Sequence, residues 1–195
     1  MRSPNKTFRP CSYAAMGGLL AVLLACGGKA AGDGTTAAAP SAGTLSYTAP
    51  ATAGFQLVRD PSSTRTHVVL NLVGPQGTQL KGVGLSLTVD GAKASWAKVG
   101  GTDPYLLEGS ALTLGTGTKL VKSQLAGQTL EAAVYQKGAT APATLGTQAI
   151  LTVALDLKAG APRGPVTLSS ASATLLDAAG KTQTIAVAVG SLTVE

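Results

Sequence analysis

The sequence predicts an all-β fold, an antiparallel sandwich of two sheets. Apolar and polar residues alternate with a period of two in several short runs after about residue 55. Turn-forming pairs and clusters rich in glycine, proline and aspartate separate these runs, and no long segment has a helical period. The alternating runs are 68–72, 83–89, 130–135, 151–158 and 185–194, and the turns are 74–75, 90–91, 100–101 and 177–180.

The first 25 residues have the three parts of a secretory signal peptide in the expected order. Arg2, Lys6 and Arg9 form a positively charged start. Residues 13–25 follow as an uncharged, mostly apolar run. This run is shorter than the roughly 20 apolar residues that a transmembrane helix needs. We therefore expect residues 1–25 to direct secretion and to be removed.

The end of this signal peptide resembles a lipobox, because a small residue precedes Cys26 in Leu23-Leu24-Ala25-Cys26. In such a box the cysteine becomes the lipid-modified N-terminus. Two or more acyl chains hold a protein stably on a lipid bilayer without spanning it. The alternative is an ordinary cleaved signal peptide in which Cys26 has no role. Gly27, instead of aspartate, after the cysteine favours the outer membrane or cell surface in a cell envelope with two membranes.

Residues 26–54 are predicted to form a lipid-anchored flexible linker, because glycine, alanine, threonine and proline dominate them. Residues 55–195 are predicted to form the sandwich, which is long enough to bury a core without cross-links.

Composition excludes several functions. Removal of the signal peptide leaves 12 basic against 9 acidic residues, scattered along the chain, so we expect no nucleic-acid partner. Cys26 is then the only cysteine, and it would be acylated, so the folded part has no thiolate for catalysis or for a metal. No phosphate-binding loop or nucleophile elbow occurs, and we expect neither a cofactor nor a metal.

Five segments, most of them in the C-terminal third, have the order and spacing of strands in a known family. They are 149–160 (AILTVALDLKAG), 164–169 (GPVTLS), 173–180 (ATLLDAAG) and 185–194 (IAVAVGSLTV), together with 82–90 (GVGLSLTVD) nearer the N-terminus. Through these segments the chain shows a resemblance to cohesin modules. It implies a jelly-roll sandwich of about nine strands, shared with some carbohydrate-binding modules, and a dockerin-like protein as partner. Leu85 and Leu155 stand where that family usually has aromatic residues.

Few residues are candidates for a site. Trp96, Tyr105 and Tyr135 are the aromatic residues available for stacking on a glycan. His67 is the only histidine, and it is predicted to be an exposed residue on the polar face of a strand. Asp103 and Glu108 flank a loop and would allow acid–base work or calcium binding, but turn residues and solubilising charge explain the acidic residues better.

These observations favour a membrane-anchored, non-catalytic binding lipoprotein that displays a cohesin-like sandwich to a protein partner. The first alternative is a module of the same fold that binds a polysaccharide. The second is a structural envelope lipoprotein without a specific ligand. We expect no enzymatic activity.

Overall fold

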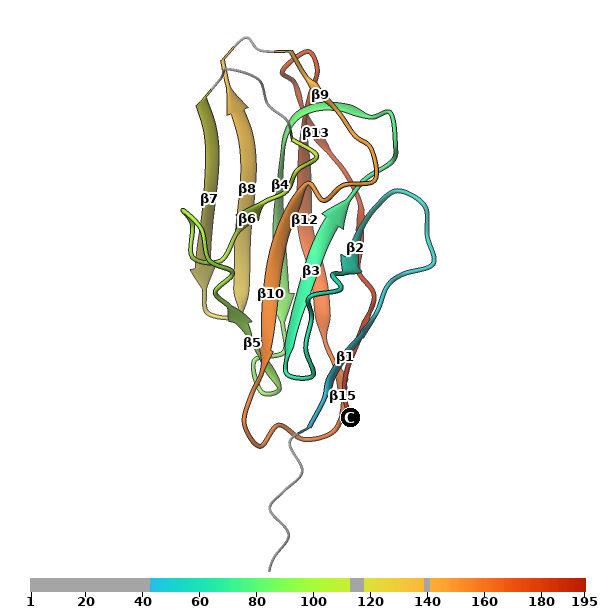
Figure 1. Cartoon of the computed structure of the whole chain (residues 1–195), viewed down its shortest axis with the longest axis vertical. Helices are drawn as coiled ribbons and strands as arrows, with labels where there is room; N and C mark the ends of the chain where they lie inside the picture. The colour runs from blue at the N-terminus through green and yellow to red at the C-terminus, as the bar shows by residue number, and fades with distance from the viewer. Residues whose placement is uncertain (1–42, 113–117, 139–140) are drawn as a thin grey trace, which may run out of the picture. The chain divides into compact units, whose positions relative to one another are not determined.

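The computed structural model describes residues 43–112, 118–138 and 141–195, which form β-strands and no helix (Figure 1). The predicted all-β class is confirmed. The strands are β1 (Leu45–Thr48), β2 (Phe55–Arg59), β3 (His67–Val73), β4 (Gln79–Val89), β5 (Ala94–Ala97), β6 (Leu107–Glu108), β7 (Thr118–Ala126), β8 (Thr129–Lys137), β9 (Ala143–Thr144), β10 (Leu151–Leu157), β11 (Gly164–Val166), β12 (Leu168–Asp177), β13 (Thr182–Thr184), β14 (Val187–Ala188) and β15 (Ser191–Val194). These fifteen strands in the described residues exceed the nine that were expected, because several are pieces of two or three residues.

Two six-stranded sheets form the layers of the sandwich. One has the order β14-β2-β3-β10-β5, with β6 also paired to β10. The other has the order β13-β12-β4-β8-β7, with β9 also paired to β4. Neighbouring strands are antiparallel except for the short pair of β14 and β2. The prediction of a two-sheet jelly-roll sandwich is confirmed.

The core lies between the two sheets and is almost entirely aliphatic. On β3, Val68, Leu70 and Leu72 are fully buried, while His67 and Asn71 on the other face are partly exposed. This is the alternation that the sequence predicted. Burying one such side chain contributes roughly 1.5–3 kcal/mol, so the leucine-rich inner faces supply the main stabilisation.

A third, three-stranded sheet corrects the predicted boundary between linker and sandwich. Strand β1 pairs with β15, and β15 also pairs with β11. Leu45 and Tyr47 on β1 are only 1% and 6% exposed, so residues 43–54 begin the sandwich instead of ending a linker. Leu45 and Tyr47 are two positions apart and both point into the core. The small residues around them made this segment look like a linker in the sequence.

The C-terminal run 185–194 was expected to be one closing strand, and the structure divides it. Within it, β14 and β15 belong to two different sheets. The chain changes direction at Gly190, whose N–H donates to the hydroxyl of Tyr47 at 2.8 Å. A side chain at Gly190 would collide with the backbone of Thr48. This close approach separates β14 from β15.

The predicted signal peptide, Cys26 and residues 26–42 of the linker lie outside the described residues. Within the part of the chain that the structure describes, no helix is long and apolar enough to cross a membrane.

Candidate functional site

The three aromatic residues selected from the sequence lie in different environments. Trp96 on β5 points into the core, is 7% exposed, and donates from Nε1 to the carbonyl of Gln128 at 2.9 Å. Its ring therefore presents no face to a sugar, which corrects its assignment as a glycan-stacking candidate. The sequence placed Trp96 only after a turn, and the register with the buried Leu155 on β10 places it inward.

Tyr105 lies in the loop before β6 and is half-buried against the core. Its position is set by Asp103, whose Oδ1 accepts the N–H groups of Tyr105 and Leu106 at 3.0 and 3.1 Å. The structure does not bring Tyr105 together with Trp96 or Tyr135 into a common aromatic platform.

Tyr135 lies on β8, on the outer face of the β13-β12-β4-β8-β7 sheet. Its ring covers Gly82 and Gly84 on β4, and neither glycine has room for a side chain beneath it. The Tyr135 hydroxyl hydrogen-bonds the hydroxyl of Thr174 on β12 at 3.1 Å. Tyr135 is thus held flat across the sheet by two neighbouring strands, with part of its surface open to solvent.

An apolar row crosses the same face. Leu120 on the edge strand β7 lies opposite Tyr135, and it is 51% exposed. On the other side Gly82 lies opposite both Tyr135 and Leu176. We call Leu120, Tyr135 and Leu176 the Tyr135 row (its strands β7, β8, β4 and β12 lie side by side in Figure 1). Sequence reasoning missed Leu120 and Leu176, since only the strand registers show that they share a row with Tyr135.

Small hydroxyl residues surround the Tyr135 row. They include Ser86, Thr88, Thr129, Ser172, Thr174 and Thr184. The hydroxyls of Thr88 and Thr129 pair across β4 and β8 at 2.9 Å. Exposed Lys122 on β7 and Glu131 on β8 also lie on this face. A patch of apolar and hydroxyl groups bordered by charged residues is typical of a protein interface with a polar rim.

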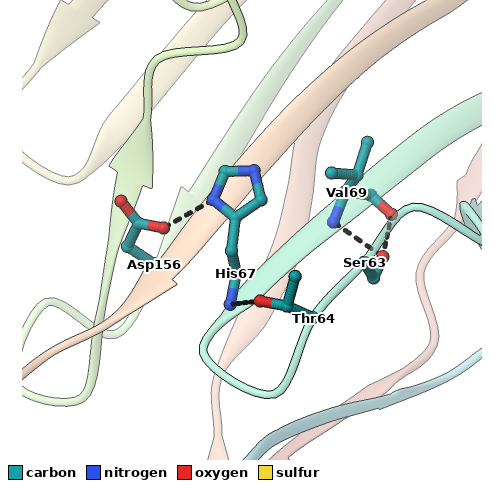
Figure 2. A network of polar contacts seen from close by, with 5 residues as sticks. All are labelled: Ser63, Thr64, His67, Val69 and Asp156. Atoms are coloured by element: carbon teal, nitrogen blue, oxygen red, sulfur yellow. Dashed lines mark hydrogen bonds and ion pairs between the residues drawn. The ribbon is translucent and has the colours of Figure 1, made fainter.

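His67 lies on the outer face of the other sheet. Figure 2 shows its Nδ1 directed at Asp156 on β10, at 2.6 Å, while the other ring nitrogen points away. Both side chains are substantially exposed, at 34% and 53%, so the pair contributes little to stability. The sequence identified His67 as a surface residue, but its partner is 89 residues away and only the pairing of β3 with β10 brings them together.

A groove of about 280 Å³ adjoins His67. Lys98, Leu107 and Thr152 line it together with Val69, Val99 and Ser62. The Thr152 hydroxyl donates to Asn71, and Asn71 donates to Asp60, so these polar groups are mutually satisfied.

Asp103 and Glu108 do not form a catalytic pair with His67. Asp103 is 8% exposed, and it accepts hydrogen bonds from the backbone and hydroxyl of Ser123 on β7. Burial raises the pKa of Asp103, but the bonds from Ser123, Tyr105 and Leu106 outweigh it and leave the pKa below its ordinary value. Glu108 forms an ion pair with Lys119. Among the described residues, no group of three His, Cys, Asp or Glu is placed to hold a metal ion.

Comparisons with known proteins identify the fold. No protein-family model and no curated protein matches the chain. Solved cohesin structures do match. One belongs to a type II cohesin–X-dockerin complex from Acetivibrio cellulolyticus, with 12% identity, a TM-score of 0.56, and coverage of 71% of this chain and 95% of that one.

Two further cohesins agree. The second type II cohesin module of the adaptor ScaA scaffoldin from Acetivibrio cellulolyticus has 11% identity and a TM-score of 0.55, covering 71% of this chain and 86% of that one. Type II cohesin A11 from Bacteroides cellulosolvens has 15% identity and a TM-score of 0.53, covering 70% and 94%. The resemblance inferred from the sequence is confirmed for the fold: this chain contains a cohesin-like β-sandwich.

Proposed function

We propose that this protein is a membrane-anchored, non-catalytic binding lipoprotein whose cohesin-like sandwich binds a protein partner. The cohesin of the Acetivibrio cellulolyticus complex has the same fold and binds an X-dockerin. The partner proposed for this chain is correspondingly a dockerin-like protein, bound on the cell surface or at the outer membrane, where acylated Cys26 would hold the module.

The Tyr135 row is the observation that carries this proposal. Leu120 is a large apolar side chain that is half exposed on a strand, beside an aromatic ring that hydrogen bonds hold in place. Rigid aromatic residues with apolar neighbours contribute most of the free energy in many protein interfaces. The surrounding hydroxyls satisfy polar groups of a partner without the desolvation cost of charges.

A charge placed in the row tests the proposal. Leu120→Glu is expected to weaken the complex at least about tenfold, because a partner would bury the new carboxylate unpaired. The matched control is Leu107→Glu, since Leu107 is also an exposed leucine on a strand, 42% accessible, but belongs to the other sheet. Leu120 is 51% and Leu107 is 42% exposed, and neither belongs to the hydrophobic core, so neither change is expected to disturb it.

The measurement starts with capture of secreted and envelope proteins of the source organism on the immobilised protein. The captured protein is then identified by mass spectrometry, and its dissociation constant is measured for wild type and both variants. Loss of binding by Leu120→Glu with retention by Leu107→Glu supports the proposal. Equal binding by all three forms moves the interface to another face, and capture of no protein contradicts a protein-binding function.

Polysaccharide binding is the second candidate, and Tyr135 with its flanking hydroxyls favours it. A tyrosine ring held parallel to a sheet among serine and threonine residues can stack on a pyranose while the hydroxyls bond its oxygens. Retention on a polysaccharide column that Tyr135→Ala abolishes and Tyr135→Phe preserves, in the absence of a protein partner, would favour this function. If the protein binds neither a protein partner nor a polysaccharide, the remaining function is that of a structural envelope lipoprotein.

A further inference from the structure

A hollow lined by two arginines lies where the described chain begins. Its volume is about 340 Å³, and its lining residues are Thr44, Leu45, Ser46, Arg59, Ser63, Thr64 and Arg65. None of these is acidic. The hollow lies between β1 and the hairpin that joins β2 to β3, because the N–H of Leu45 donates to the carbonyl of Arg65 at 2.7 Å.

Both guanidinium groups are held in place by the protein. Arg59 Nη2 donates to the carbonyl of Ser63 at 3.3 Å, and Arg65 Nε donates to Thr44 Oγ1 at 3.2 Å. A guanidinium has five N–H donors, so each arginine keeps most of them for another acceptor. Neither arginine forms an ion pair among the described residues.

Two hydroxyls add donors. Thr44 Oγ1 accepts from Arg65, and Thr64 Oγ1 accepts from the N–H of His67 at 3.2 Å, so the hydrogen of each hydroxyl remains to be donated. The nearby Asp60 carboxylate accepts instead from Ser62 and Asn71. Hydrogen bonds from Ser62, and then from Asn71, lower the pKa of Asp60.

This combination of donors suits a phosphate group. Planar guanidinium groups bind phosphate oxygens through paired, charge-assisted hydrogen bonds, and hydroxyls can supply additional ones. A carboxylic acid lining the hollow would oppose an anion, and none lines it.

We propose that the Arg59–Arg65 hollow binds the phosphate of phospholipid headgroups in the membrane that carries the protein. The inference rests on the proposed anchor at Cys26. The covalent path from Cys26 to Gly43 extends to at most about 60 Å, and Thr44 at its end already lines the hollow. The hollow is therefore the part of the described sandwich nearest, along the chain, to the lipid.

The test reproduces the anchor chemically, so its outcome does not depend on acylation in the cell. Cys26 is the only cysteine of the mature chain, residues 26–195. Its thiol can be coupled to a maleimide lipid in vesicles of phosphatidylcholine mixed with phosphatidylglycerol. Hydrogen exchange of residues 43–46 and 59–66 then reports contact with headgroups, by comparison with the uncoupled chain.

We expect exchange in these two segments to slow on the vesicles. In the double variant Arg59→Gln with Arg65→Gln, the ratio of headgroup-bound to free sandwich is expected to fall at least about tenfold, since each arginine near an anionic surface contributes roughly a fivefold factor. The control variant, Lys81→Gln with Lys122→Gln, removes the same charge from another part of the molecule and is expected to keep the protection.

Two outcomes would overturn the proposal. If Arg59→Lys with Arg65→Lys keeps full protection, the hollow provides only positive charge and is no phosphate site. If inorganic phosphate binds the uncoupled chain but vesicles give no protection, the ligand is free phosphate and the membrane is excluded as its source. Failure of Cys26 acylation in cells would instead contradict the proposed anchor and would leave the vesicle result unchanged.

Discussion

Asp103 is a single side chain that holds together two segments at the edge of the β13-β12-β4-β8-β7 sheet, whose outer face carries the Tyr135 row. It joins the loop before β6 to the edge strand β7, because its two oxygens accept from Tyr105, Leu106 and Ser123. The N–H of Ser123 would otherwise lie unpaired on the outer edge of β7, where exposed backbone groups can recruit a strand of another molecule. The sequence indicated a loop carboxylate, and the structure shows that it stabilises an edge.

Replacing Asp103 by asparagine is expected to destabilise the protein. The new amide would place a donor against either the N–H of Ser123 or the N–H groups of Tyr105 and Leu106, which costs about 1–3 kcal/mol in the free energy of unfolding. Chemical denaturation at neutral pH measures the loss. Glu131→Gln on the exposed face of β8 is the control, and an equally large effect there would mean that the change reports charge and not the Asp103 contacts.

Asp103 also predicts the response to acid. Its folded-state pKa lies below the ordinary value of 3.8, so its ionised form stabilises the fold fully above about pH 4. This contribution is lost as the pH falls through the folded-state pKa. Below about pH 4 the wild type should therefore lose stability more steeply than Asp103→Asn. Parallel pH profiles for the two proteins would show that the carboxylate is not coupled to folding.

At the scale of elements, β1 decides where the folded domain begins. Its Tyr47 hydroxyl donates to the carbonyl of Leu57 at 3.0 Å and accepts from Gly190, so one side chain joins β1 to β2 and to the turn before β15. Burial raises the pKa of this hydroxyl, and the bond from Gly190 only partly opposes the rise. Strand β1 is therefore an integral part of the sandwich.

A pair of substitutions on β1 tests this boundary. Leu45→Ala is expected to lower the free energy of unfolding by about 2–5 kcal/mol, because it empties a site that is 1% exposed. Thr48→Ala on the same strand is exposed and should change stability by less than about 0.5 kcal/mol. Thermal and denaturant unfolding measure both. If the two substitutions have equally small effects, β1 is not part of the cooperative fold.

At the scale of the whole molecule, the proposed anchor at Cys26 would determine where the proposed binding face works. Mass spectrometry of protein extracted from membranes is expected to find a chain that starts at Cys26 and carries a diacylglyceryl group and a further acyl chain. Cys26→Ser should lose this modification and the mature, membrane-retained form. A wild-type chain with a free Cys26 thiol, or one cleaved at another bond, would contradict the lipobox interpretation.

The sequence by itself determined the class of the fold, the position of most long strands and the resemblance to cohesins. Period-two alternation is a local property, so runs such as 68–72 and 151–157 predict strands without knowledge of their partners. The buried face is also predicted correctly for 68–72, whereas in 151–155 both faces of the strand are buried. The turn aspartates were also predictable. Asp177, for example, accepts from the N–H of Lys181 beside Gly180, whose φ of 80° favours glycine.

Only the tertiary structure decided which residues meet. Trp96 and Tyr135 both lie on strands, but strand register places the first in the core and the second on the surface over two glycines. The pairing of His67 with Asp156, and the alignment of Leu120 with Tyr135, likewise depend on registers between separate strands. Alternation places a side chain on a face, whereas long-range pairing determines its neighbours, and a binding site is made of neighbours.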